Sequence, residues 1–226
     1  MDKINTKNIG RKFNSDGTVR FFQGNTIISK IKSDNNIYPI ALKVSKLFQE
    51  GNFSNKYSFL PDESFHMTII QGLCDEDRKE ELWSNYLPLD ESLTKVDDFF
   101  EEKFKQIKTM DKTEMIFDYV DITNNIIIIR FIPKNENDQE NLNRYRNDIS
   151  ANLGIKFPDH DRYGYHISIA YQLWEMDEAE KAEIKKIRDK VERWLIKECP
   201  SFKLEQPILT YFDNMFYFNE DRIPRH

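Results

Sequence analysis

Two short segments, one hundred positions apart, constrain the fold more than any other part of the sequence. Residues 65–70 (FHMTII) and 165–170 (YHISIA) each combine apolar residues with one histidine and, two positions later, one hydroxyl residue. Both have the pattern of a β-strand, in which successive side chains point to opposite faces. The histidine and the hydroxyl of each segment therefore share a face. Each strand is predicted to pack one face in the core and to present the other to a functional site.

The polar faces of these strands carry His66 with Thr68 and His166 with Ser168. An imidazole titrates near neutral pH, so one histidine can accept a proton while the other, when protonated, donates one. Neighbouring hydroxyl groups can bind the non-bridging oxygens of a phosphate and hold the phosphorus in place. Across a shared cleft, the four residues would form a catalytic site for phosphodiesters that needs no metal or other cofactor. The sequence leaves open which histidine is the base.

The composition limits the class of partner. The chain has 226 residues and a formal net charge of −6. This acidic balance excludes an extended nucleic-acid surface, which needs a basic excess, but it permits a nucleotide or the end of an RNA strand. No stretch approaches 18 consecutive apolar residues, and the first residues contain no apolar leader. We therefore expect a cytoplasmic monomer without a membrane segment.

Periodicity and turn residues predict an alternation of strands and helices. The nearly all-isoleucine arm at 126–133 is predicted to lie centrally in a sheet, covered on both faces. Asn124 and Asn125 predict a tight hairpin turn before it. The expected elements are a strand at 25–31, a helix at 38–49, a strand at 57–60, the first histidine strand, a short helix at 75–83, a helix from 93 to about 108, the hairpin 114–123 and 126–133, a helix at 137–153, the second histidine strand, a long helix opened by Asp177 and ended by Pro200, and strands at 207–212 and 215–218.

The two halves of the chain resemble each other in this order of elements. Each half contains a strand, a helix and then a histidine strand, and no linker rich in proline, glycine or serine separates them. We therefore expect residues 1–226 to form a single bilobal domain with interleaved lobes and one shared cleft, preceded by an N-terminal loop segment at 1–24.

The paired motif is similar to that of the 2H phosphoesterase superfamily, which is defined by two H-x-[ST]-x motifs with apolar neighbours. Residues 66–69 (HMTI) and 166–169 (HISI) match this pattern in full. Residues 10–13 (GRKF), 24–26 (GNT) and the segment 65–75 also resemble an uncharacterised branch of the superfamily.

The resemblance implies an α+β, LigT-like fold in which two antiparallel sheets with outer helices surround a central cleft. It also implies hydrolysis of a 2′,3′-cyclic phosphate or a related nucleotide or RNA-end phosphodiester, a reaction typical of RNA processing. In this reading His66 and His166 are catalytic, whereas Thr68 and Ser168 bind the substrate phosphate. The residues do not identify the nucleotide or the linkage.

Four further residues are candidates for substrate contacts. Tyr163 and Tyr171 flank the second motif and could stack on a base or donate a hydrogen bond to phosphate. Arg11 and Lys12 belong to the N-terminal loop segment, from which a positive charge could reach a second phosphate. For each residue the alternative is an ordinary structural role, as a packed aromatic ring or a solvated charge.

Two other functions remain open. Asp159, His160 and Asp161, together with His166, could bind a divalent metal and make the protein a metal-dependent hydrolase. However, they lack the regular spacing of a metal site on a helix or strand. Alternatively, the same fold could be a non-catalytic module that binds a nucleotide or an RNA end.

Overall fold

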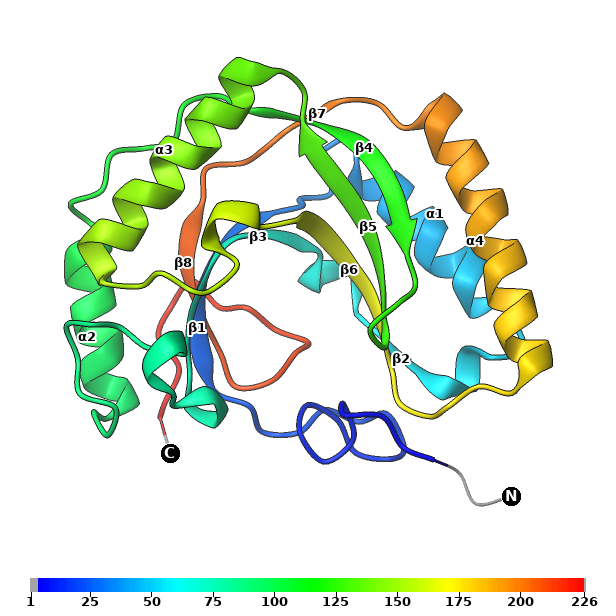
Figure 1. Ribbon diagram of the computed structural model, residues 1–226, viewed down its shortest axis with the longest axis horizontal. Coiled ribbons are helices and arrows are strands. Elements are labelled where there is room, and N and C mark those ends of the chain that lie inside the picture. The colour runs from blue at the N-terminus through cyan, green and yellow to red at the C-terminus, as the bar shows by residue number, and fades with distance from the viewer. Residues whose placement is uncertain (1–3, 226) are drawn as a thin grey trace.

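The computed structural model describes residues 4–225, so residues 1–3 of the expected N-terminal loop segment lie outside the described part. Its strands are β1 Gly24–Lys30, β2 Tyr57–Phe59, β3 His66–Cys74, β4 Glu114–Asp121, β5 Ile126–Pro133, β6 Tyr165–Gln172, β7 Phe202–Lys203 and β8 Ile208–Phe212. They form one strongly curled antiparallel sheet with the order β7-β4-β5-β6-β3-β1-β8, while β2 pairs with β6 (Figure 1).

The expectation of two separate sheets is wrong, because the two histidine strands join the halves into one sheet. β3 and β6 pair through a single ladder position, Met67 opposite Ile167. On either side of it, β3 pairs with β1 and β6 pairs with β5 over most of their lengths. The halves therefore resemble two sheets that share one short seam, and the seam lies between the two histidine motifs.

The register of the sheet repeats with an offset of one hundred positions. Both strand pairs are antiparallel, and both contain a register shift at the corresponding place, between Ile27 and Ile28 and between Ile127 and Ile128; β1 and β3 have a second one between Gly24 and Thr26. This correspondence makes the two halves structural repeats of each other. The matching pairs are Ile27–Ile70 with Ile127–Ala170, Ile28–Thr68 with Ile128–Ser168, Lys30–His66 with Arg130–His166, and Thr26–Gln71 with Ile126–Tyr171.

Helices cover the outer side of the curled sheet in two pairs (Figure 1). They are α1 Tyr38–Gln49, α2 Leu93–Phe104, α3 Glu136–Leu153 and α4 Glu178–Glu198. α1 packs with α4, and α2 packs with α3. Two helices also contact the histidine strand of the other half of the sheet. α1, which follows β1, contacts β6, and α3, which follows β5, contacts β3. Each half therefore supports the histidine strand of the other.

Local sequence signals set the ends of most of these elements. Asp177 and Glu180 form a reciprocal capping box at the start of α4. α3 ends at Gly154, whose φ of 66° suits a residue without a side chain. Asn124 and Asn125, with φ of 53° and 63°, form the hairpin turn between β4 and β5. These parts of the prediction are confirmed.

Three expected elements differ from the structure. Residues 75–83 form two short 3₁₀ helices, Asp75–Asp77 and Glu80–Leu82, because this charged segment has no continuous apolar stripe to pack. Residues 215–218 form a turn instead of a strand. α2 ends at Phe104, since Ile107 donates its backbone N–H to the carbonyl of Phe104, a tightened turn that stops the α-helical pattern.

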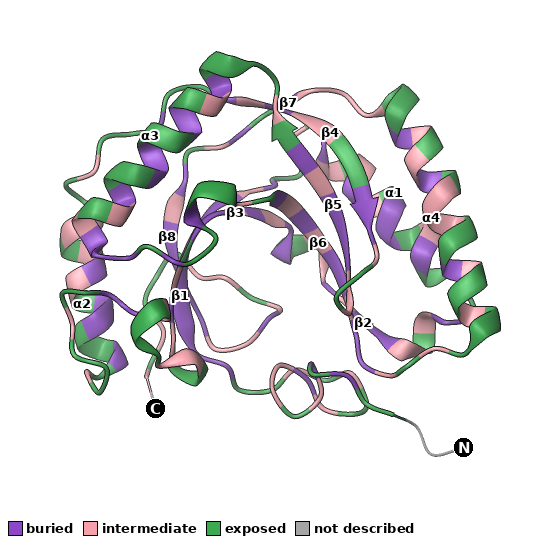
Figure 2. Cartoon of the chain, viewed as in Figure 1, coloured by how far each residue is buried: buried purple, intermediate pink, exposed green. Residues whose placement is uncertain are grey.

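Most buried side chains lie between the sheet and the helices, and the outer faces of α3 and α4 are exposed (Figure 2). Ile127, Ile128 and Ile129 of β5 are buried, and the strand lies between β4 and β6, so the predicted central position is confirmed. A smaller cluster, which includes Phe13 and Phe22, fixes the N-terminal segment to the rest of the fold. Among residues 4–225, no helix is both long and apolar enough to cross a bilayer.

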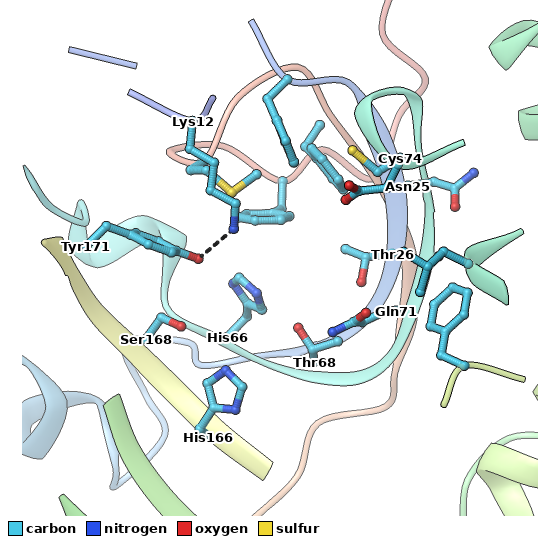
Figure 3. A pocket seen from close by; sticks show the side chains of 18 of the residues that line it. Lys12, Asn25, Thr26, His66, Thr68, Gln71, Cys74, His166, Ser168 and Tyr171 are labelled. Carbon is cyan, nitrogen blue, oxygen red and sulfur yellow. Dashed lines mark hydrogen bonds between the residues drawn. The ribbon is translucent and has the colours of Figure 1, made fainter. Parts of the chain in front are cut away.

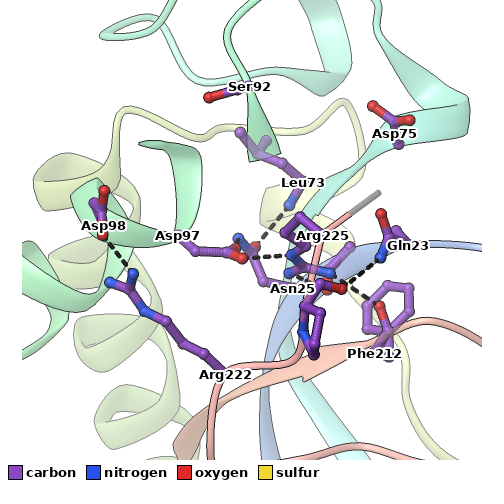
Figure 4. Close-up of polar contacts among 12 residues, drawn as sticks. Gln23, Asn25, Leu73, Asp75, Ser92, Asp97, Asp98, Phe212, Arg222 and Arg225 are labelled. Carbon is purple, nitrogen blue, oxygen red and sulfur yellow. Dashed lines mark hydrogen bonds and ion pairs between the residues drawn. The ribbon is translucent and has the colours of Figure 1, made fainter. Parts of the chain in front are cut away.

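A buried ion pair anchors the C-terminal segment beside β1. Arg225 donates from Nε to Asp97 of α2 at 2.6 Å, and the two side chains are 6% and 2% exposed. The same guanidinium donates to the carbonyls of Phe212 and Gly24 at 3.2 Å and 3.1 Å (Figure 4). Asp97 also accepts from Asn25 Nδ2 at 3.0 Å. This network joins β1, β8 and α2.

We expect Arg225→Met to lower the free energy of unfolding by about 3 kcal/mol, because the change leaves the Asp97 carboxylate buried without its cation. The matched control is Arg222→Met, since Arg222 pairs with Asp98 and Glu101 near the surface and its loss costs about 1 kcal/mol or less. Urea denaturation of the two variants checks this difference. Equal effects of the two substitutions would contradict it.

Candidate active site

The polar faces of β3 and β6 line one cavity of about 370 Å³ on the inner side of the curled sheet. All eight residues selected from the sequence line this cavity, although they come from three separate parts of the chain. In Figure 3, Lys12, Ser168 and Tyr171 lie on one side of it, Thr26, Thr68 and Gln71 lie on the other, and the two histidines lie between them. The eight are Arg11, Lys12, His66, Thr68, Tyr163, His166, Ser168 and Tyr171.

The seam between the histidine strands explains why the motifs meet. In an antiparallel pair, residues one step before and after a matched position oppose each other. Because Met67 is opposite Ile167, this register sets His66 toward Ser168 and Thr68 toward His166. The side chains of Met67 and Ile167 are fully buried in the core, so their polar neighbours point to the opposite face, into the cavity.

A bulge follows the hydroxyl residue in both strands. Ile69 and Ile169 are the extra residues at the two corresponding register shifts, since the partner strands skip them. A bulge re-aims the side chains that follow it. As a result, Gln71 and Tyr171, rather than residues 70 and 170, line the cavity beyond the hydroxyls.

The backbone holds both imidazoles in the same way. His66 Nδ1 lies 2.7 Å from the carbonyl oxygen of Ser64, and His166 Nδ1 lies 2.9 Å from that of Gly164. A carbonyl can only accept, so each Nδ1 carries a hydrogen and donates it. In the neutral ring the lone pair is then on Nε2. Each histidine therefore has Nε2 available for proton transfer in the cavity.

Burial makes His66 a neutral imidazole. Desolvation is the main reason that the pKa of His66 falls to about 4; the hydrogen bond to the Ser64 carbonyl opposes this shift, and the charge of His166 contributes to it. The ring of Phe218 lies against the imidazole, with 4.3 Å between the ring centroids. Phe218 comes from the turn after β8, so the C-terminal part of the chain contributes to the surroundings of the first histidine.

His166 has more polar surroundings. Burial is again the main cause that lowers its pKa, and the positive charges of Arg130 and Lys12 act in the same direction, whereas Asp121 opposes them. Arg130 also donates to the carbonyl of Gly164 at 3.0 Å, so this oxygen receives hydrogen bonds from both the guanidinium and the imidazole. Arg130 thereby fixes the carbonyl that orients His166.

Tyr163 forms the wall between the cavity and α3. Burial raises the pKa of its hydroxyl, whereas the charge of Arg146 and the neighbouring Thr68 act in the opposite direction. The buried guanidinium of Arg146 lies 4.5 Å from the centroid of the ring and donates to the carbonyl of His160 at 2.8 Å. Tyr163 therefore remains a neutral phenol, and its ring lies between the Arg146 guanidinium and the ring of His166.

The N-terminal segment places two cations at the cavity. Lys12 Nζ lies 4.6 Å from the ring centroid of Tyr171 and 5.5 Å from that of Phe22, and no carboxylate within residues 4–225 pairs with it. By contrast, Arg11 forms an ion pair with Asp77 in the segment after β3. The net charge at this end of the cavity is therefore positive and comes from Lys12.

The residues of the alternative metal site do not gather around His166. His160 is buried, and its Nε2 lies 2.9 Å from Oδ1 of Asn147 on α3. Asp161 is exposed and pairs with Lys156. Within the part of the chain that the structure describes, no three histidine, cysteine or acidic side chains are close enough to hold a metal ion together.

Sequence reasoning missed three residues at this site: Gln71, Arg130 and Phe218. A comparison of the two motifs could have found Gln71, because it stands five positions after His66, as Tyr171 stands five positions after His166. Arg130 and Phe218 reach the histidines only through long-range pairing, and no local pattern marks them.

Comparisons with known proteins identify the family and the fold. The family model described as "2H-phosphodiest: Domain of unknown function (DUF1868)" matches residues 12–125, just over half of the chain, including the first histidine motif. A crystal structure of a conserved protein of unknown function from Agrobacterium tumefaciens, ATU0111, has the same fold: the TM-score is 0.89 at 20% identity, over 97% of this chain and 93% of the other. None of the curated proteins compared with the chain matches it. The family match confirms the resemblance seen in the paired motifs, and the chain belongs to the 2H phosphodiesterase family of this model, within the 2H phosphoesterase superfamily.

Proposed function

We propose that the protein is a metal-independent phosphodiesterase that hydrolyses a 2′,3′-cyclic phosphate, or a related nucleotide or RNA-end phosphodiester. The main support is that two histidines, each with Nδ1 bound to a backbone carbonyl, present Nε2 to one cavity that also contains two hydroxyls. These groups supply a base, an acid and phosphate ligands, which are the functions that in-line hydrolysis of a phosphodiester requires.

The surroundings of the histidines favour His66 as the base and His166 as the acid. His66, whose imidazole packs on the ring of Phe218, is neutral and can accept a proton from water. His166 lies near the carboxylate of Asp121, which favours its protonated form. As water attacks phosphorus, its proton passes to His66 Nε2. The bond from phosphorus to the leaving ribose oxygen breaks, and that oxygen takes a proton from His166 Nε2.

Thr68 and Ser168 would bind the two non-bridging oxygens and hold the phosphorus between the imidazoles. Lys12 adds a positive charge that would attract the anionic substrate and could bind a further phosphate. The ring of Tyr171 beside it offers a flat surface on which a base can stack. The volume of the cavity suits a ligand of about nucleotide size.

We expect His66→Asn and His166→Asn each to reduce hydrolysis of 2′,3′-cyclic nucleotides by about a hundredfold to ten-thousandfold, because each removes a proton-transfer group. Rates are measured in EDTA. The control is His160→Gln, which changes a histidine outside the cavity and should retain activity. Activity that appears only after a divalent metal is added would contradict the mechanism, and nucleotide binding without turnover would favour the binding module.

We expect a bell-shaped dependence of kcat/KM on pH, with its optimum between about pH 4 and 6.5. The rate rises as His66 loses its proton near its pKa of about 4, and it falls as His166 loses its proton at a pKa below its ordinary 6.5. Arg130→Met removes a positive charge near His166, so the falling limb should move to higher pH. An optimum above pH 7 would contradict this assignment.

We expect Thr68→Val and Ser168→Ala each to lower kcat/KM by about tenfold to a hundredfold, since each loses a hydrogen bond to a charged phosphate oxygen. Unlike the histidine variants, they should keep the pH optimum of the wild type. Thr94→Val, an exposed position on α2, is the matched control. A pH optimum that shifts in the hydroxyl variants would argue against simple phosphate binding.

A further inference from the structure

Gln71 occupies a distinct position in the cavity. It stands on β3 two positions after the bulge residue Ile69, as Tyr171 stands on β6 two positions after the bulge residue Ile169. The two side chains are therefore equivalent in the repeated halves, but one is an amide and the other an aromatic ring. In Figure 3 they lie on opposite sides of the two histidines.

The side-chain amide of Gln71 does not stabilise the fold through hydrogen bonds within the described residues, 4–225. Its side chain is exposed in the cavity, and it makes no hydrogen bond to any side chain or backbone group of residues 4–225. Asn25, the other amide that lines the cavity, is 1% exposed and fully engaged. Its Oδ1 accepts from the backbone of Leu73, and its Nδ2 donates to Asp97, both at 3.0 Å. Asn25 therefore supports the fold, whereas Gln71 has a donor and an acceptor free for a ligand.

Gln71 lies on the same strand as His66 and Thr68, so its amide lines the cavity near the residues proposed to bind the phosphate. A nucleotide whose phosphate is held between Thr68 and Ser168 can extend toward either side of the cavity. One side offers the ring of Tyr171 and the charge of Lys12. The other side offers the amide of Gln71 and the hydroxyl of Thr26 (Figure 3). The repeated framework is symmetric, but its two ends would recognise different chemistry.

We propose that Gln71 is a specificity residue that binds the hydrogen-bonding edge of a nucleobase on the Thr68 side of the phosphate. A glutamine amide presents one donor and one acceptor in a plane, which complements the adjacent donor and acceptor on a base edge. Phe157 and Leu82 line the same cavity and add apolar surface to it. This inference rests on the proposed function, since it assumes a nucleotide phosphate between the histidines.

The test compares ligands with and without a base. Binding of adenosine 3′-monophosphate, uridine 3′-monophosphate and ribose 5-phosphate is measured by titration calorimetry in EDTA for the wild type and for Gln71→Met, which keeps the length of the side chain but removes the amide. The control, Gln106→Met, lies at an exposed position beyond the end of α2. Thermal melting of each variant establishes that it is folded.

We expect Gln71→Met to bind at least one of the two nucleotides about tenfold or more weakly than the wild type does, with unchanged affinity for ribose 5-phosphate. The control should bind all three ligands like the wild type. Equal nucleotide affinities of wild type and Gln71→Met would overturn the proposal, as would wild-type binding of ribose 5-phosphate as tight as that of the nucleotides, or no binding at all.

Turnover of the four 2′,3′-cyclic nucleotides separates this inference from the proposed function. If the wild type hydrolyses them and Gln71→Met retains the same order of preference, the role of Gln71 is wrong and the phosphodiesterase stands. If no cyclic nucleotide is hydrolysed but Gln71→Met loses nucleotide affinity as expected, the proposed reaction is wrong and the base contact stands.

Discussion

The pairing of Met67 with Ile167 is the contact on which the candidate site depends. It is the only ladder position that joins β3 to β6 within residues 4–225, and it sets both histidine motifs on the same face of the sheet. Side chains alternate along a strand, so a slip of one residue would turn the imidazole of that strand into the core. Both paired side chains are fully buried, and this apolar contact opposes such a slip.

Helices α1 and α3, each of which packs on the histidine strand of the other half, stabilise the short pairing between β3 and β6. One hydrogen-bonded position would be a weak connection between two independent sheets, but α1 packs on β6 and α3 packs on β3. β3 thus pairs along its edge with β1 and packs its outer face on α3. β6 likewise pairs with β5 and packs on α1. The carbonyls that orient the imidazoles, those of Ser64 and Gly164, stand just before these strands, so the same packing fixes the direction of both rings.

Much of this arrangement could be predicted from the sequence, namely the features that depend on residues close to one another in the chain. The alternation at residues 65–70 and 165–170, the Asn124–Asn125 turn and the Asp177 cap each depend on neighbours in sequence, and the structure contains all of them. Other features depend on strands that are distant in sequence. The single seam, the bulges and the approach of Phe218 to His66 follow from long-range pairing, which a local period does not reveal. The helix predicted at residues 75–83 was wrong for another reason. Acidic residues resembled the start of a helix, but the segment has no apolar face with which a helix could pack.

The pairing of β1 with β8 has a consequence for how the chain reaches this structure. β1 lies near the beginning of the chain, and its outer partner, Ile208–Phe212, lies near the end. During synthesis the edge of β1 therefore stays unpaired until residues 208–212 have left the ribosome. Contacts between such distant residues slow folding, because a long loop must close before they form. The half that contains His66 is therefore complete only after β8 has been made, later than the strands of the other histidine.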